Sequence, residues 1–235
     1  MTDYFGEKVA ARYDESTGEY FEVAVIESTV DFLTELAGDG GALELGIGTG
    51  RIALPLARRG VRVHGIDLST AMVAKLQEKL GAEEVGVTVG DLATTKVDGS
   101  FSLAYVVFNT INNLTTQDAQ VACFENAAAH LGPGGHFVVE VGMPNTQPLQ
   151  VFDLSDTHVG VDELDADSQR LVSHHFSLIE GQWHRASVPF RSVSPAELDL
   201  MARIAGMTLR ERWSGWKREP FTSESTKHIS VWQKM

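Results

Sequence analysis

Cysteine and long apolar runs are both scarce in this sequence. Cys123 is the single thiol among 235 residues, which excludes an internal disulfide and fits a reducing compartment. No stretch approaches the roughly 18 consecutive apolar residues that a membrane-spanning helix needs. The first fifteen residues also lack the basic segment and apolar run of a secretory signal. We therefore expect a cytoplasmic protein with no membrane partner.

Positive charge is scarce as well. The chain carries 19 basic and 32 acidic residues, a formal net charge of −13. Such a chain has no electrostatic footprint for a phosphate backbone, so no nucleic acid is expected as a partner. Its length and its 43% hydrophobic content are those of one globular domain that buries its own core. We expect a single domain over residues 1–235.

Short apolar runs alternate with helical patterns from about residue 40 to 141, which is typical of parallel βαβ units. The expected strands are 41–46, 61–67, 85–91, 103–109 and 136–141. One helix is expected to run through Arg59, and two more to span 69–80 and 115–131. Ser69 and the pair Thr115 and Asp118 supply start signals for the second and third of these helices. The core 40–144 is therefore expected to be an α/β fold.

Different patterns flank this core. Residues 1–39 form a leader with two helical patterns, and 145–192 is a polar, β-leaning insertion in which 169–179 and 182–191 read as a hairpin. The closing segment 193–235 begins with a capping box and a proline at the first helical position, Ser194-Pro195-Ala196-Glu197. It ends in two expected strands, 207–213 and 227–233.

The most informative stretch is Glu44-Leu45-Gly46-Ile47-Gly48-Thr49-Gly50. Glycines let the chain turn sharply and approach a ligand closely, and the following helix directs its free N–H groups at that ligand. The spacing is G-x-G-x-G. A dinucleotide fingerprint, G-x-G-x-x-G, would place a glycine where this chain has Arg51. A P-loop is excluded because no G-x-x-x-x-G-K-S/T is present.

Acidic residues end the first three expected strands. Asp67 lies where a carboxylate can accept both hydroxyls of a ribose, and Asp91, after Gly90, where it can accept an adenine amino hydrogen. Glu44 ends the first strand. A single carboxylate at a strand end is more often a helix cap, but three at consecutive strand ends behind a glycine loop favour a ligand site.

Four segments resemble motifs of the class I S-adenosylmethionine-dependent methyltransferases: ALELGIGTGRIALPLA, HGIDLS, VGDL and LGPGGHFVVEV. The resemblance implies S-adenosylmethionine as cofactor. It assigns the methionine end of the cofactor to Glu44 and to the loop of Gly46, Gly48, Thr49 and Gly50, which Arg51 follows. The ribose is assigned to Asp67, and the cofactor ammonium to the Asn109 carbonyl. The adenine is assigned to Leu68, Met72, Asp91 and Leu92. For the side chains of Met72 and Leu92, plain core packing is an equally good interpretation.

The family also implies a Rossmann-like, doubly wound sheet of seven strands with the last strand antiparallel. The tail, with Pro220-Phe221 in its loop, is similar to the closing hairpin of small-molecule methyltransferases. We expect the insertion to form an antiparallel β cap over the acceptor, after the fifth strand. Ser102 departs from the family, many members of which have aspartate there, at a position remote from the ligand edge.

Methyl transfer from a sulfonium requires alignment and exclusion of water more than a strong catalytic group. The sequence around the acceptor is therefore less informative. Enzymes that methylate exocyclic amino groups of nucleobases carry an Asn/Asp-Pro-Pro-aromatic motif after the fourth strand. This chain lacks that motif, because its residues 109–113 read Asn-Thr-Ile-Asn-Asn. The adjacent His174 and His175 would point to opposite faces of a strand, and no H-E-x-x-H is present, so we expect no metal.

Three residues are candidates for the acceptor side. Tyr13 matches a tyrosine that closes over the cofactor in similar enzymes, or else it ends an apolar stripe. Glu140 ends the fifth strand and is either a pocket residue, the favoured interpretation, or part of a buried salt bridge. Asn113 stands where some nucleotide-sugar N-methyltransferases have a histidine. Beyond these, Arg191 holds an anionic acceptor or pairs with the acidic surface, which is the favoured interpretation, and Trp216 is a candidate for lining the substrate mouth.

The sequence thus predicts a methyltransferase that acts on the nitrogen or oxygen of a small molecule, as a monomer or homodimer. The alternatives are a protein or lipid-like acceptor, and a binding module that has lost catalysis.

Overall fold

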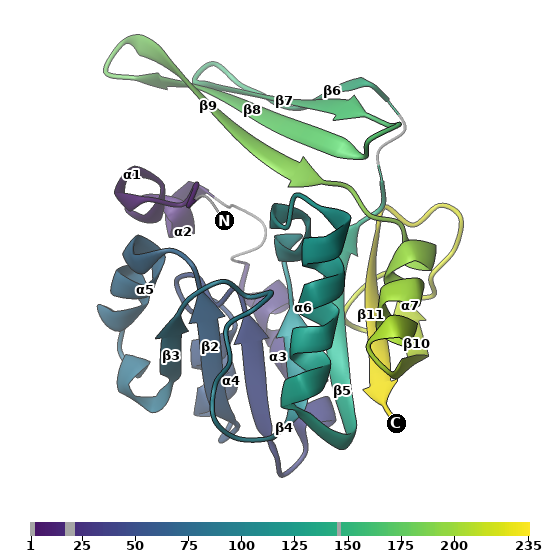
Figure 1. The fold of residues 1–235 in the computed structure, drawn as a ribbon. Coiled ribbons are helices and arrows are strands. Elements are labelled where there is room, and N and C mark those ends of the chain that lie inside the picture. Colours follow the sequence, from purple (N-terminus) through teal and green to yellow (C-terminus); the bar gives the residue numbers. More distant parts are fainter. Residues whose placement is uncertain (1–2, 17–21, 145–146) are drawn as a thin grey trace.

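The computed structural model describes residues 3–16, 22–144 and 147–235 (Figure 1). Its main sheet has seven strands in the order β10-β11-β5-β4-β1-β2-β3. The strands are β1 (Gly41–Leu45), β2 (Arg62–Asp67), β3 (Gly86–Val89), β4 (Phe101–Val106), β5 (Leu131–Gly142), β10 (Met207–Trp213) and β11 (Lys227–Lys234). The first five are parallel, and β11 is antiparallel to β5 and to β10. The expected Rossmann-like sheet is confirmed.

Helices cover both faces of the sheet, which explains why β1 is buried along its whole length. Figure 1 shows α6 (Gln117–His130) and α7 (Pro195–Ile204) in front and α3 (Val23–Ala37) behind. The other helical elements are α1 (Glu7–Ala10), α2 (Tyr13–Ser16), α4 (Ala53–Arg58), α5 (Thr70–Gln77), η2 (Ala82–Glu84) and η3 (Thr110–Asn113). No helix of the described residues is long and apolar enough to cross a bilayer.

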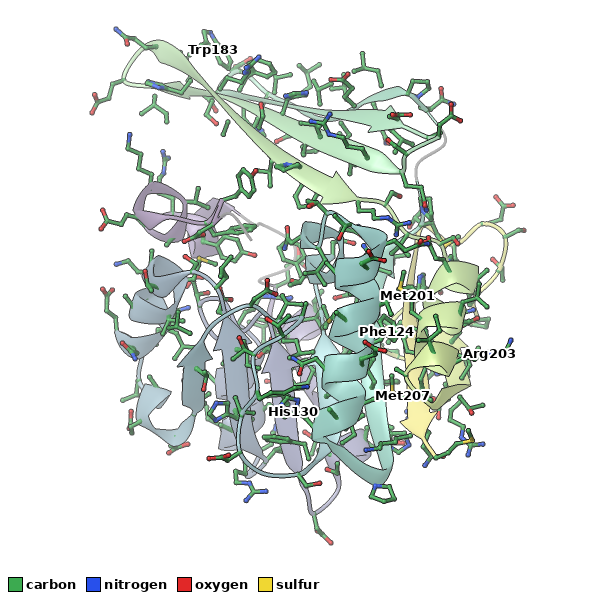
Figure 2. All side chains as sticks on the ribbon, in the orientation of Figure 1. Phe124, His130, Trp183, Met201, Arg203 and Met207 are labelled. Atoms are coloured by element: carbon green, nitrogen blue, oxygen red, sulfur yellow. The ribbon has the colours of Figure 1, made fainter. Side chains whose placement is uncertain are left out.

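The front layer has an aromatic centre. Phe124 on α6 meets Phe137 and Trp232 edge-on, at centroid distances of 4.9 and 5.3 Å. Figure 2 shows Phe124, Met201 and Met207 between α6, the sheet and α7. All five side chains belong to one buried cluster, so this face of the sheet is fixed by close packing.

Serines and a threonine begin three of the helices. Ser69 accepts the Met72 N–H at 3.3 Å, and Ser194 accepts the Glu197 N–H at 3.3 Å. Helix α6 is capped by Thr116, which accepts the Ala119 N–H at 3.1 Å, one residue later than the expected Thr115. Only the hydroxyl of the residue that adopts the extended cap conformation can reach this N–H.

The insertion after β5 forms a second, antiparallel sheet of four strands, which we call the cap. Its strands are β6 (Leu149–Leu154), β7 (His158–Asp165), β8 (Arg170–Ile179) and β9 (Gln182–Arg191). The sequence indicated only the β8–β9 hairpin within an antiparallel cap. Figure 1 shows the cap above the carboxyl ends of the parallel strands, where the order of a doubly wound sheet reverses and ligands bind.

Candidate functional site

The loop after β1 turns through three glycines in the left-handed region, the last of them Gly50 with φ +79°. Gly46 has φ +89° and Gly48 has φ +55°. A Cβ on Gly46 would lie 2.5 Å from Thr110 Cγ2, and one on Gly48 would meet Met72 Cε at 3.4 Å. The loop therefore runs between η3 and α5 with no room for a side chain at Gly46.

Asp67, at the end of β2, is bonded to this loop. Its Oδ2 accepts the Gly48 N–H at 2.7 Å and its Oδ1 accepts the Ser69 N–H at 2.9 Å. Burial raises the pKa of Asp67, and these two N–H bonds oppose the rise. A carboxylate offers about four lone-pair sites, so each oxygen keeps capacity for a ligand hydroxyl.

Glu44 is buried at the end of β1, with an exposed fraction of 2%. The Tyr105 hydroxyl donates to its Oε2 at 2.9 Å. Burial raises the pKa of Glu44 to about 8, and the Tyr105 bond and Arg51 oppose the rise. A carboxylate in such surroundings gains strongly from a cation placed beside it.

The expected adenine side is less regular. The third strand ends at Val89, two residues before Asp91, whose Oδ1 accepts the Ala93 N–H at 2.8 Å in a local turn. Leu92 and Met72 are both buried, and Leu68 is half-buried. Leu92 belongs to the core cluster, as in the packing interpretation, whereas Met72 lies against Gly48.

The leader reaches the glycine loop through Tyr13 and its neighbour. The Thr49 hydroxyl donates to Asp14 at 2.6 Å, and Tyr13 meets Phe5 edge-on at a centroid distance of 6.2 Å. Burial raises the pKa of Tyr13 to about 12. The positive charge of Arg51 opposes this rise, and the negative charge of Asp67 adds to it. The Tyr13 hydroxyl therefore stays protonated at neutral pH and does not act as a base.

Glu140 lies in the buried salt bridge that the sequence left as the second interpretation. Its Oε1 accepts from Lys227 Nζ and Trp216 Nε1, both at 3.2 Å, and its Oε2 accepts the Phe108 N–H at 3.1 Å. Three donors bind this carboxylate, so the favoured pocket role is corrected. The sequence offered no signal for Lys227, which joins Glu140 only through the pairing of β11 with β5.

Trp216 is also placed differently from its expected position. It is 7% exposed, packs against Phe32 with ring centroids 5.5 Å apart, and donates to Glu140. It belongs to the buried cluster on the α3 side of the sheet. Because the ring is enclosed there, Trp216 does not line a substrate mouth.

The segment after β4 carries the remaining candidates. Asn109 has φ +59° and its Oδ1 accepts the Gly142 N–H at 2.7 Å, while its carbonyl accepts the Asn112 N–H at 2.9 Å. One lone pair of that carbonyl remains for a ligand ammonium. Asn113 is half-buried on η3, which packs against β9 of the cap.

Arg191 ends β9 in a buried cluster that we call the cap anchor: Arg191, Gln120, Gln169 and Glu197. Its guanidinium donates to Gln120 Oε1 at 2.5 Å and to both Gln169 Oε1 and Glu197 Oε1 at 2.6 Å. Arg191 thus pairs with an acidic side chain, as in the favoured interpretation, but it does so in the interior and not at the acidic surface. Gln120 and Gln169 were missed, because an isolated glutamine carries no local signal.

The surface also has two hollows. One, of about 370 Å³, is lined by Ser102, Gly135 and neighbouring residues at the amino ends of the strands. The other, of about 560 Å³, lies between α7 and the loop 221–223. Neither includes a residue of the glycine loop. Among the described residues, no three histidine, cysteine or acidic side chains gather as metal ligands do.

Comparisons with known proteins agree on one family. A model described as a methyltransferase domain matches residues 42–135. The CcbJ methyltransferase from Streptomyces caelestis is 34% identical, with a TM-score of 0.90 over 99% of both chains. The cypemycin N-terminal methyltransferase of a Streptomyces species is 28% identical over 80% of this chain and 81% of its own. CalS10, an S-adenosylmethionine-bound amino pentose methyltransferase from Micromonospora echinaspora, shares the fold, with 19% identity and a TM-score of 0.73 over 100% and 99% of the two chains.

Proposed function

Because this chain belongs to the S-adenosylmethionine-dependent methyltransferases, we propose that it methylates a nitrogen or oxygen of a small molecule held beneath the cap. The observation that carries this proposal is the contact of β9 with η3. It brings the cap directly over the segment that follows β4, at the edge where the glycine loop lies. A roofed compartment aligns two small reactants and removes water from between them.

We assign the cofactor to the groups that line this edge. The second lone pairs of the Asp67 oxygens receive the ribose hydroxyls, and Asp91 receives the adenine amino group between Leu68 and Met72. Glu44 faces the methionine ammonium with the free lone pair of the Asn109 carbonyl. These assignments use capacity that the protein's own hydrogen bonds leave open.

The chemistry favours nitrogen over oxygen as nucleophile. The acceptor lone pair attacks the methyl carbon, the carbon–sulfur bond breaks with its electrons on sulfur, and the acceptor loses a proton. A hydroxyl nucleophile needs a base for that proton, whereas a neutral amine attacks first and loses its proton to water. Tyr13 is protonated at neutral pH and Glu140 is bound by three donors. Neither supplies a base, and the Asn113 carboxamide acts only as a polar contact.

A peptide amino terminus is the second candidate acceptor. The cypemycin relative is named for N-terminal methylation and aligns over 80% of this chain. Such an acceptor is also an amine, but it enters the compartment as the end of an extended chain.

The test is formation of S-adenosylhomocysteine with a panel of matched acceptors. Each amino sugar, amino acid ester and aliphatic amine is paired with its hydroxyl analogue, and a short peptide is compared with its N-acetylated form. Turnover of amines but not of their hydroxyl analogues supports a small-molecule N-methyltransferase. Turnover restricted to free peptide termini selects the second candidate. Tight cofactor binding without turnover of any acceptor would contradict both.

A further inference from the structure

The carboxamide of Asn112 on η3 has an unusual environment. Its Oδ1 is buried, and no donor within the described parts of the chain reaches it. The residue as a whole is half-buried, so the amide lies at the boundary of the core. Folded chains rarely leave a buried amide oxygen unbonded, because its lost hydration is then not replaced.

Two other amide side chains that contact η3 or its flanks are hydrogen-bonded. Gln120 Nε2 donates to the carbonyls of Ile111 and Arg191, both at 3.2 Å, and Asn109 Oδ1 accepts the Gly142 N–H. The unbonded oxygen of Asn112 differs in this respect from both of these amides.

The same bonds hold η3 in place. Through Gln120, the Ile111 carbonyl on η3 and the Arg191 carbonyl on β9 share one donor, while Asn109 ties the start of η3 to the end of β5. Since these contacts fix the backbone on both sides, Asn112 cannot move far to find a partner within the protein. Asn112 lies on η3, which contacts β9, at the edge where the cofactor's methyl group and the acceptor meet in the function proposed above.

We infer that Asn112 is an acceptor-binding residue, whose carboxamide oxygen accepts a hydrogen bond from an N–H or O–H of the methyl acceptor. The inference rests on the proposed function. A carboxamide does not take up the proton, so Asn112 orients the acceptor and selects molecules with a donor beside the reacting atom. A site built to bond a polar group rejects analogues that lack it, because its own buried group is then left unpaired.

The test compares Asn112→Leu and Asn112→Asp with Thr115→Leu, a control at an exposed position just after η3. The probe is the panel acceptor that the wild type turns over fastest. Asn112→Leu is expected to raise the KM of that acceptor about tenfold or more, with S-adenosylhomocysteine affinity within twofold of wild type. Asn112→Asp keeps an accepting oxygen and restores most of the loss. Thr115→Leu changes the acceptor KM by less than threefold.

A second measurement separates binding from structure. Because leucine removes an unsatisfied buried group without removing a bond, Asn112→Leu is expected to unfold at the same temperature as the wild type or higher. A wild-type acceptor KM in Asn112→Leu would overturn the inference while leaving the proposed function intact. An equal rise in the acceptor KM of both leucine variants would also overturn it. So would a loss of S-adenosylhomocysteine affinity in Asn112→Leu as large as the rise in its acceptor KM. Absence of turnover by the wild type with every acceptor would instead refute the proposed function.

Discussion

Burial changes the acid–base behaviour of single side chains at the ligand edge of the sheet. Glu44 is the clearest case, since its surroundings raise its pKa to about 8 from the ordinary 4.5. The folded, ligand-free chain therefore binds more protons than the unfolded chain between about pH 4.5 and 8. Stability from this group is present at the low end of that window and is lost as the pH rises through it.

Replacing Glu44 with glutamine should remove this pH dependence. Over the window, the free energy of unfolding of the ligand-free wild type should fall relative to Glu44→Gln, by up to about 1.4 kcal/mol per pH unit. Urea denaturation of both proteins from pH 5 to 9 measures the difference, and subtraction cancels the other titrating groups. If the free energies of unfolding of the two proteins differed by a constant amount from pH 5 to 9, the pKa of Glu44 would not be raised by folding.

Asp67 should be decisive for the cofactor. Asp67→Ala removes the carboxylate proposed to bond the ribose hydroxyls, and hydrogen bonds to charged groups contribute about 1.5–3 kcal/mol. Affinity for S-adenosylhomocysteine should fall at least tenfold in titration calorimetry, with an unchanged circular dichroism spectrum. Asp39→Ala, at an exposed position before β1, is the control. Unchanged affinity in Asp67→Ala would mean that the carboxylate serves only to fix the loop.

Glu140 should matter for stability more than for cofactor binding. Glutamine has one accepting oxygen, so in Glu140→Gln its NH₂ group must face a donor that the carboxylate now accepts. We expect a loss of about 1–3 kcal/mol in the free energy of unfolding, the cost of leaving a buried group unsatisfied. A double-mutant cycle with Lys227→Met isolates the ion pair. A large fall in turnover with no loss of stability would restore the pocket role.

The contact between cap and core is an effect of whole elements. The cap anchor joins β9 and the turn at Gln169 to α6 and α7. Arg191 on β9 forms an ion pair with Glu197 on α7, with side chains 7% and 15% exposed. The same guanidinium donates to Gln120 on α6 and to Gln169. Through the Gln120 bond to the Ile111 carbonyl, the anchor also fixes η3. The elements that enclose the proposed acceptor compartment thus depend on one polar cluster.

Breaking this anchor should loosen the cap. Arg191→Met removes the guanidinium donor from the oxygens of Gln120 and Gln169, while Glu197 keeps only the neutral donors Gln117 and Gln169. We therefore expect a loss of about 3 kcal/mol, at the low end of the cost of removing one partner of a buried pair. Hydrogen exchange should accelerate in β9 and η3 before the main sheet is affected. Arg59→Met, which breaks exposed pairs with Glu27 and Asp31, should cost under about 1 kcal/mol. Equal effects of the two variants would contradict a special role for the anchor.

Ligand binding should stabilise the whole molecule. S-adenosylhomocysteine at a hundred times its Kd adds about 2.7 kcal/mol to stability, which for a chain of 235 residues raises Tm by roughly 5–11 °C. NADH should give no shift, because Arg51 stands where a dinucleotide site needs glycine. Scanning calorimetry with each ligand is the measurement. A shift with NADH and none with S-adenosylhomocysteine would be incompatible with the proposed cofactor site.

Local chemistry made part of this molecule predictable from its sequence. The glycine loop, the caps Ser69 and Ser194 and the strand-ending Asp67 depend on residues close together in the chain, and each lies where its pattern indicated. The seven-stranded sheet with its last strand antiparallel followed from the family resemblance.

Other features depend on residues that are distant in sequence. Strand β5 begins at Leu131, not near 136, because Leu131 pairs with Phe101 across a shift in register. Glu140 meets Lys227 and Gln120 meets Arg191 only after separate elements have packed together.

The sequence by itself therefore determined the cofactor loop and the alternation of strands and helices, since turn geometry, capping and periodicity act over a few residues. Only the tertiary structure decided which buried polar groups found partners, because a carboxylate or an amide has no local preference for one distant donor over another. That is why Glu140 changed from a pocket candidate to an ion-pair residue, and why Asn112, without a sequence signal of its own, was left with an unbonded oxygen beneath the cap.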